Sequence, residues 1–356
     1  MVKRRLLISL LILLLSITCL SAGVSVATGA VTPTELVQEP SSAFTALSKL
    51  PVWKWTTTRM LLYSGQRQIG DVYIAQDRLL KIPDEIDDRA FDTAARRIGS
   101  LSIETGVPVT LAVIPDAAIL YENQLSALLP LPEERQALTE LYGKMPESVT
   151  TVNLYTALND VREEHIFYRT DEHWTSLGAY YGYAAICRQM GLQVLQKEKF
   201  TIRYMEHEAL GGLYRQTAYG AHLSDSVDFY QLSGNPAAVT VTIENPATAT
   251  GTVTERDSIY RTEYLSTQDF PAAFLGPEAD RITITMSNSE EPKGKLLLIG
   301  DLSAHTAAQF LIQHYDEITI LPTNALIGEI DATGYQQILI LTDCTELQNT
   351  FRKGIK

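Results

Sequence analysis

The segment from Tyr168 to Thr175 contains residue types that can move protons. Asp171 and His173 stand two positions apart, so both side chains point to the same side of an extended segment. A carboxylate beside an imidazole fixes its tautomer and stabilises the imidazolium, as a general base for a hydroxyl nucleophile requires. A structural alternative stays open, in which Asp171 caps the helix that follows and His173 packs beside it.

A second stretch can present a nucleophile. Residues 295–299 predict a buried strand, Gly300 and Asp301 a turn, and residues 304–315 a helix. A helix N-terminus offers backbone N–H groups and a positive dipole end to a developing oxyanion. Ser303 is the only nearby nucleophile candidate, and its structural alternative is the N-cap of this helix. His305 is either a substitute base or a surface residue of the first turn.

Strands and helices alternate along the chain, and this order predicts the scaffold. The sequence predicts an α/β domain with a central, mostly parallel sheet, where ligands bind at the carboxyl ends of the strands. Residues 68–82 read as a hairpin, and residues 198–290 as a β-rich insertion or an extended sheet edge. The predicted strands are 109–114, 150–154, 166–169, 295–299, 317–320 and 336–341, and the predicted helices are 86–105, 116–129, 132–144, 175–190 and 304–315.

The N-terminus has the pattern of a targeting segment. Lys3, Arg4 and Arg5 precede an uncharged apolar run from Leu6 to Leu20. We expect residues 1–27 to be a signal peptide or a membrane anchor, because residues 6–27 are long enough to span a bilayer. The rest of the chain is then extracytoplasmic, secreted or anchored. Residues 28–60 are expected to be a linker and lead-in, and residues 61–350 one domain that includes the insertion.

Charge and cysteine usage exclude several function classes. The 356 residues contain 42 acidic and 29 basic side chains, a formal net charge of −13. This balance argues against a nucleic-acid partner and against docking by charge on an anionic membrane. No phosphate loop or metal-ligand spacing is present, so no cofactor and no metal are expected. We favour buried free thiols for Cys187 and Cys344, while a disulfide between them stays open.

In this order, the two stretches resemble the DHHW family of exported proteins. These are relatives of the alginate O-acetyltransferases with an SGNH-hydrolase-like fold, and the resemblance is carried by residues 167–179 and 296–311. It implies a three-layer α/β domain. Active relatives use an Asp–His–Ser triad to add an acetyl group to, or remove one from, a cell-surface or secreted polysaccharide. Asp171 and His173 match the first two members, and the implied partners are a glycan and a membrane-bound acetyl donor.

The sequence departs from the family pattern mainly in its nucleophile half. Leu302 follows Asp301, where active relatives have the serine, and a one-residue slip to Ser303 rotates the side chain by about 100° in helical geometry. Glu172 replaces the second residue of the signature, and the run 275–278 replaces Gly-Gly-Asn and brings Glu278. One reading is an O-acetyltransferase or acetylesterase with Asp171, His173 and Ser303 as its triad. The alternative is a catalytically inactive relative that serves as a glycan-binding or scaffold protein.

Overall fold

The structure is a computed structural model that describes residues 51–233, 238–245, 252–287 and 292–353. The expected targeting segment at residues 1–27 lies outside the described residues. Within the described ranges, no helix is both long and apolar enough to cross a membrane. The described residues divide into two compact units. One contains residues 51–69 and Gln216–Tyr219, and the other contains Gly70–Arg215 and the described residues from Gly220 to 353.

The smaller unit contains α4 (Pro51–Tyr63) and the short strand β1 (Gln68–Ile69). Thr58 Oγ1 donates a hydrogen bond to the carbonyl of Thr217 at 2.6 Å. The guanidinium of Arg59 lies 5.2 Å from the ring centre of Trp55 and 5.9 Å from that of Tyr219. These contacts join the two sequence segments of the unit.

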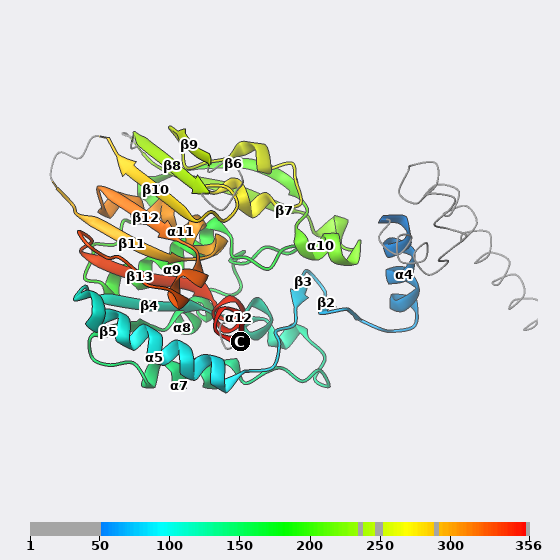
Figure 1. Ribbon diagram of the computed structural model, residues 1–356. Coiled ribbons are helices and arrows are strands. Elements are labelled where there is room, and N and C mark those ends of the chain that lie inside the picture. Colours follow the sequence, from blue (N-terminus) through cyan, green and yellow to red (C-terminus); the bar gives the residue numbers. More distant parts are fainter. Residues whose placement is uncertain (1–50, 234–237, 246–251, 288–291, 354–356) are drawn as a thin grey trace, which may run out of the picture. The chain divides into compact units, whose positions relative to one another are not determined.

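The larger unit is built on an eight-stranded sheet (Figure 1). Its first five strands pair in parallel and the last three pair antiparallel. The predicted mostly parallel α/β sheet is therefore confirmed. In spatial order the strands are β5 (Val149–Val152), β4 (Val109–Ile114), β13 (Gln337–Asp343), β11 (Lys295–Gly300), β12 (Glu317–Leu321), β10 (Arg281–Met286), β8 (Val239–Asn245) and β9 (Thr252–Arg256).

Both faces of the sheet are covered by helices, which gives the three predicted layers. Along β11, Leu296 and Leu298 pack into one hydrophobic core and Leu297 and Ile299 into the other. Strands buried on both faces read as continuous apolar runs, and this is why the sequence identified them. One face carries α6 (Ala117–Leu120), α8 (Leu154–Asn159), α9 (Ser176–Gln189) and α11 (Leu302–Leu311), and the other carries α5 (Asp88–Thr105), α7 (Glu134–Gly143) and α12 (Cys344–Lys353).

The region 198–290 supplies both an inserted sheet and an extended sheet edge. β6 (Phe200–Ala209) and β7 (Asp225–Leu232) form a separate antiparallel pair, while β8, β9 and β10 continue the main sheet. The predicted hairpin is present as β2 (Val72–Ile74) and β3 (Leu79–Lys81). The remaining elements are α10 (Gly212–Thr217) and the short 3-10 helices η1 (Glu122–Gln124), η2 (Lys197–Lys199), η3 (Ala221–Leu223), η4 (Thr262–Tyr264), η5 (Phe270–Ala273), η6 (Ile312–His314) and η7 (Thr323–Ile327).

Two predicted elements were wrong. The helix expected over 116–129 is only the four-residue α6 followed by η1. Asp116 makes no cap hydrogen bond to it, and Leu128 is 93% exposed, so the later turns gain no packing. The strand expected over 166–169 is a loop closed by one bridge between Phe167 and Trp174.

The two cysteines in the described ranges are buried free thiols, as favoured from the sequence. Cys187 lies in the core on one face of the sheet and Cys344 in the core on the other face. The sheet therefore separates the two sulfur atoms, and the disulfide left open above is absent.

Candidate functional site

The loop from Phe167 to Trp174 is held from two sides. The backbone N–H of Tyr168 donates to the His173 carbonyl at 3.1 Å. From β7, the fully buried carboxylate of Asp225 accepts hydrogen bonds from Arg169 N at 2.6 Å, Thr170 N at 2.9 Å and Thr170 Oγ1 at 2.6 Å. Asp225 was missed from the sequence, where nothing distinguishes it from other acidic residues of the insertion.

Asp171 and His173 meet in this loop. His173 Nδ1 lies 2.6 Å from Asp171 Oδ1, which also accepts the His173 backbone N–H at 3.1 Å. Asp171 Oδ2 accepts the N–H of Gly212 at 2.9 Å. The segment is bent rather than extended, and the pair forms through this local turn. Asp171 does not cap α9, because Thr175 Oγ1 does so by accepting Gly178 N.

The pair is an ion pair at neutral pH. Burial opposes the charged form of each group, but the mutual charge and hydrogen bond outweigh it. The charge and hydrogen bond of His173 and the N–H groups of Gly212 and His173 lower the pKa of Asp171. Burial lowers the pKa of His173, but the charge and hydrogen bond of Asp171 outweigh it and raise this pKa to about 10. Glu172 and Asp301 add smaller contributions in the same direction. The imidazole therefore holds a proton on both nitrogens.

The nucleophile half of the site begins at Asp301, between β11 and α11. Asp301 is 4% exposed and caps α11 by accepting Ser303 N at 2.7 Å. Its other oxygen accepts Thr342 Oγ1 and Asp343 N, each at 2.8 Å. The alternative role of Ser303 as the N-cap is therefore ruled out, because α11 begins at Leu302 and Asp301 occupies the cap position.

Ser303 is buried, whereas a nucleophile must be reachable by its substrate. It is 2% exposed, whereas Leu302 is half-buried. Trp174 Nε1 donates to the Ser303 carbonyl at 3.1 Å, so the first turn of α11 touches the loop of the ion pair. Within the described part of the chain, no hydrogen bond joins Ser303 to His173. The structure brings Asp171 and His173 together and places only the backbone of Ser303 beside their loop.

His305 is not the surface residue expected from the sequence. It is 3% exposed, and its Nδ1 donates to the Gly276 carbonyl at 3.2 Å. Burial lowers the pKa of His305 to about 4, so the ring is neutral at pH 7. With one nitrogen engaged in the interior, His305 has a structural role in holding the 275–278 run.

Glu278 adds negative charge to the same region. Partial burial, followed by the charges of Asp301 and Glu346, raises the pKa of Glu278. Glu172, the departure in the signature, forms an ion pair with Lys81 at the end of β3. An oxyanion formed at this edge of the sheet would therefore meet carboxylates rather than added hydrogen-bond donors.

The fold brings together a second group that the sequence did not indicate. Asp116, Glu134 and Cys344 each offer one ligand atom, and these atoms lie within 4.8 Å of one another. The three residues come from the end of β4, the start of α7 and the start of α12. Their separation along the chain gave no metal-ligand spacing to recognise.

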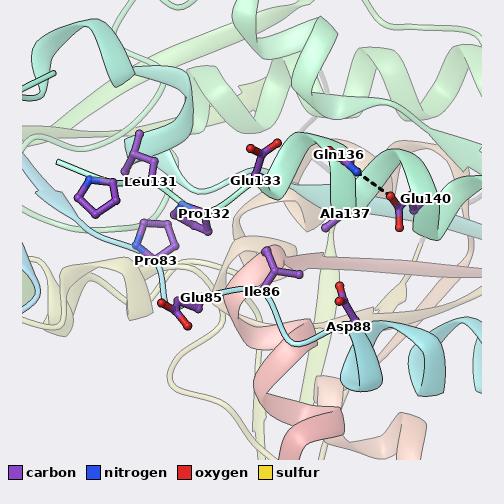
Figure 2. A pocket seen from close by; sticks show the side chains of 11 residues that line it. Pro83, Glu85, Ile86, Asp88, Leu131, Pro132, Glu133, Gln136, Ala137 and Glu140 are labelled. Carbon is purple, nitrogen blue, oxygen red and sulfur yellow. Dashed lines mark hydrogen bonds between the residues drawn. The ribbon is translucent and has the colours of Figure 1, made fainter. Parts of the chain in front are cut away.

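A surface groove of about 440 Å³ lies between the segment leading into α5 and the beginning of α7 (Figure 2). Pro83, Leu131 and Pro132 contribute apolar walls, and Gln136 Nε2 donates to Glu140 Oε1 at 2.9 Å. None of the site residues predicted from the sequence lines this groove. Its charged side chains are Glu85, Asp88, Glu133 and Glu140.

Comparisons with solved structures show which fold this is. A DHHW family protein from Eubacterium siraeum is 20% identical, with 79% of this chain and 94% of that chain covered and a TM-score of 0.61. PatB1 of Bacillus cereus, solved with a sulfonyl adduct, is 18% identical, with 80% and 99% covered and a TM-score of 0.66. The O-acetyltransferase domain of Pseudomonas putida AlgJ is 13% identical, with 78% and 92% covered and a TM-score of 0.47. The similarity to the first two confirms the predicted fold.

A comparison with curated proteins found no match. The family model described as DHHW protein matches residues 103–318, more than half of the chain and the segment that holds the Asp171–His173 pair and the turn at Asp301. The chain belongs to the DHHW family.

Proposed function

We propose that this chain acts in the O-acetylation of cell-envelope or secreted polysaccharide as a glycan-binding protein that does not itself transfer the acetyl group. The observation that carries the proposal is at the start of α11. Leu302 occupies the half-buried position after Asp301, and Ser303 is 2% exposed. A leucine side chain has no group that attacks an ester.

The pair beside this position does not separate the two functions by itself. Asp171 raises the pKa of His173 to about 10, and an aspartate beside a histidine is also what a catalytic base uses. What favours binding over turnover is the leucine at position 302.

The remaining groups suit a sugar. Nδ1 of His173 is engaged by Asp171, so its Nε2–H is left to donate to a hydroxyl or an acetyl carbonyl. The carboxylates of Glu172 and Glu278 are exposed and accept hydrogen bonds from hydroxyl groups. The proposed ligand is a polysaccharide chain lying across the carboxyl edge of β11 and β13.

Location and partner form part of the proposal. Residues 1–27 would export the chain or, through residues 6–27, anchor it outside the cytoplasm. A membrane-bound protein would donate the acetyl group. The domain would then occupy residues 61–350, and the glycan-binding edge would be on the outer side of the membrane.

Two hydrogen bonds favour a second candidate, an acetyltransferase or acetylesterase that uses Ser303. The Asp171–His173 hydrogen bond of 2.6 Å is intact, and the Trp174–Ser303 hydrogen bond keeps α11 against its loop. In that case a rearrangement of the first turn would expose the Ser303 hydroxyl to His173.

Fluorophosphonate labelling of the full chain separates the two candidates. Intact mass and peptide mapping would locate any adduct, with PatB1 as positive control. We expect no adduct on Ser303 in the wild type and an adduct at position 302 in Leu302→Ser, where the family nucleophile is restored. An adduct on Ser303 that disappears in His173→Ala would overturn the proposal in favour of the enzyme.

Binding is tested by titrating the wild-type chain with O-acetylated and unacetylated polysaccharides. We expect a saturable interaction without release of acetate. A folded chain that binds neither form would contradict the proposed function. Leu302→Ser serves as the matched variant, because it adds a hydroxyl without removing a group that contacts the glycan.

A further inference from the structure

We propose that Asp116, Glu134 and Cys344 bind one zinc ion between the C-terminal edge of the sheet and α7. Two carboxylate oxygens and one thiolate sulfur are a ligand set that zinc accepts, whereas magnesium and calcium prefer oxygen alone. The inference does not depend on glycan binding, since none of the three residues belongs to the Asp171–His173 site.

The first observation is proximity in the interior. The three ligand atoms lie within 4.8 Å of one another, and Glu134 and Cys344 are 1% and 2% exposed. Three acidic groups in one buried place need protons or a cation for charge balance. Zinc bonds of about 2.0–2.3 Å place tetrahedral ligand atoms about 3.3–3.8 Å apart. Side-chain rotations that move the ligand atoms by about 1 Å would therefore bring them to zinc-binding distance.

The second observation is an unpaired oxygen. Glu134 Oε1 accepts the backbone N–H of Asp116 at 3.0 Å, which turns the carboxyl group toward Asp116. Glu134 Oε2 is buried there without a hydrogen-bond donor among the described residues, and its neighbour is the Asp116 carboxyl, so the two groups need either a shared proton or a cation between them. Leaving a buried acceptor unpaired costs roughly 1–3 kcal/mol, more when it is charged. A metal ion at this point would supply the missing partner.

The third observation is the rigidity of the frame. β4 and β13 pair in parallel with Ile114 opposite Asp343, which fixes the strand ends that lead to Asp116 and Cys344. Thr345 Oγ1 donates to Asp116 Oδ2 at 2.8 Å and so orients this carboxylate from outside the cluster. Ligands on strand and helix ends are held more firmly than ligands on loops.

A surface groove adjoins the buried cluster at Glu134. Glu134 lines a surface groove of about 730 Å³ together with Ile119, Leu131 and Glu133. A hydrated zinc ion can enter through this groove, lose waters as it binds, and displace the Cys344 thiol proton into solvent. Three protein ligands leave a fourth position for a water molecule. The ion would tie together the β4–α6 corner, α7 and α12.

The experiment uses the full chain without a histidine tag, stripped with EDTA and dialysed. Calorimetric titration with zinc chloride should show one binding site per chain, and zinc should raise the melting temperature while magnesium and calcium do not. Replacement by cobalt should give a thiolate-to-metal charge-transfer absorption band. This band reports the sulfur ligand directly.

The variants assign the ligands. Cys344→Ser should abolish the cobalt–thiolate band, and Glu134→Gln should weaken zinc binding by at least about tenfold. Cys187→Ser, the matched control on the other face of the sheet, should bind zinc like the wild type. Failure of the wild type to bind one zinc, or equal binding by wild type, Cys344→Ser and Glu134→Gln, would overturn the proposal. In that case a proton shared with Asp116 neutralises Glu134.

Discussion

The Asp171–His173 ion pair makes the stability of the protein depend on pH. The pKa of His173 is raised from 6.5 to about 10, so its contribution is complete below pH 6.5 and is lost as the pH rises to about 10. The pKa of Asp171 is lowered from 3.8, so its contribution is lost as the pH falls below that value. The contribution of the pair is therefore greatest between these two ordinary pKa values.

We predict that His173→Gln lowers the free energy of unfolding by about 3 kcal/mol near pH 6, as removal of one partner of a buried pair does. The difference from the wild type should shrink steadily toward pH 10. Urea unfolding of both proteins over this range measures it. In an Asp171→Asn background the same comparison should show little pH dependence, and a pH-independent difference in the unmodified background would contradict the ion pair.

At this scale the sequence located the pair but not what holds it. Spacing was enough for Asp171 and His173, since residues two apart meet in a tight turn as well as in a strand. The groups that hold them in place come from distant parts of the chain. Gly212, whose N–H binds Asp171, is 41 residues away from it, and Asp225, which binds Thr170, is 55 residues away from it. Such contacts depend on how β6 and β7 fold back, and no local pattern encodes that.

The helix α9 is shaped by the tryptophan of the signature. Trp174 is fully buried, and a Cβ added at Gly182 would lie 2.6 Å from its ring. Real Cβ contacts are not this short, so α9 approaches the ring closely only because position 182 is a glycine.

We predict that Gly182→Ala destabilises the protein by about 1–2 kcal/mol, because overpacking outweighs the gain of about 1 kcal/mol in helix propensity. Thermal or urea unfolding measures the change. Gly143→Ala, at the end of α7, meets no atom within 4 Å and is the matched control. If both variants are equally stable, the Trp174 ring moves aside without a loss of stability, and the predicted overpacking is wrong.

Element prediction succeeded where burial alone decides and failed where distant partners compete. β4, β11 and β13 were found because helices cover both faces of each strand. The helix expected to extend from Asp116 to residue 129 lacks a side-chain cap, because the Asp116 carboxylate accepts Thr345 Oγ1, and its later turns gain no packing, as the exposure of Leu128 shows. The sequence left Ser303 open as the cap of α11, because a good capping residue does not reveal that the helix begins one residue earlier, with Asp301 accepting the N–H of Ser303.

The net charge of the molecule influences which glycans it binds. The formal net charge is −13, and Glu172, Glu278 and Asp301 add acidic groups beside His173. A polyuronate approaching this edge is repelled, whereas a glycan with free amino groups is attracted. Exposed charges further apart than the Debye length, about 10 Å at 0.1 M salt, no longer contribute.

We predict opposite salt dependences for the two glycan classes. Raising the salt concentration should strengthen binding of a polyuronate and weaken binding of a polyglucosamine, and should leave an uncharged acetylated glycan unchanged. Isothermal titration at low and high salt measures all three. Tighter binding of the polyuronate at low salt would show that the acidic groups lie away from the binding edge.

The position of Trp174 gives the protein an internal optical reporter. The sequence has three tryptophans, and the other two, Trp53 and Trp55, lie in α4. In a chain with phenylalanine at positions 53 and 55, all indole fluorescence comes from a ring that is 0% exposed and bonded through Nε1 to the Ser303 carbonyl. The emission wavelength and lifetime of Trp174 then change whenever the His173 loop separates from α11. No dye has to be attached.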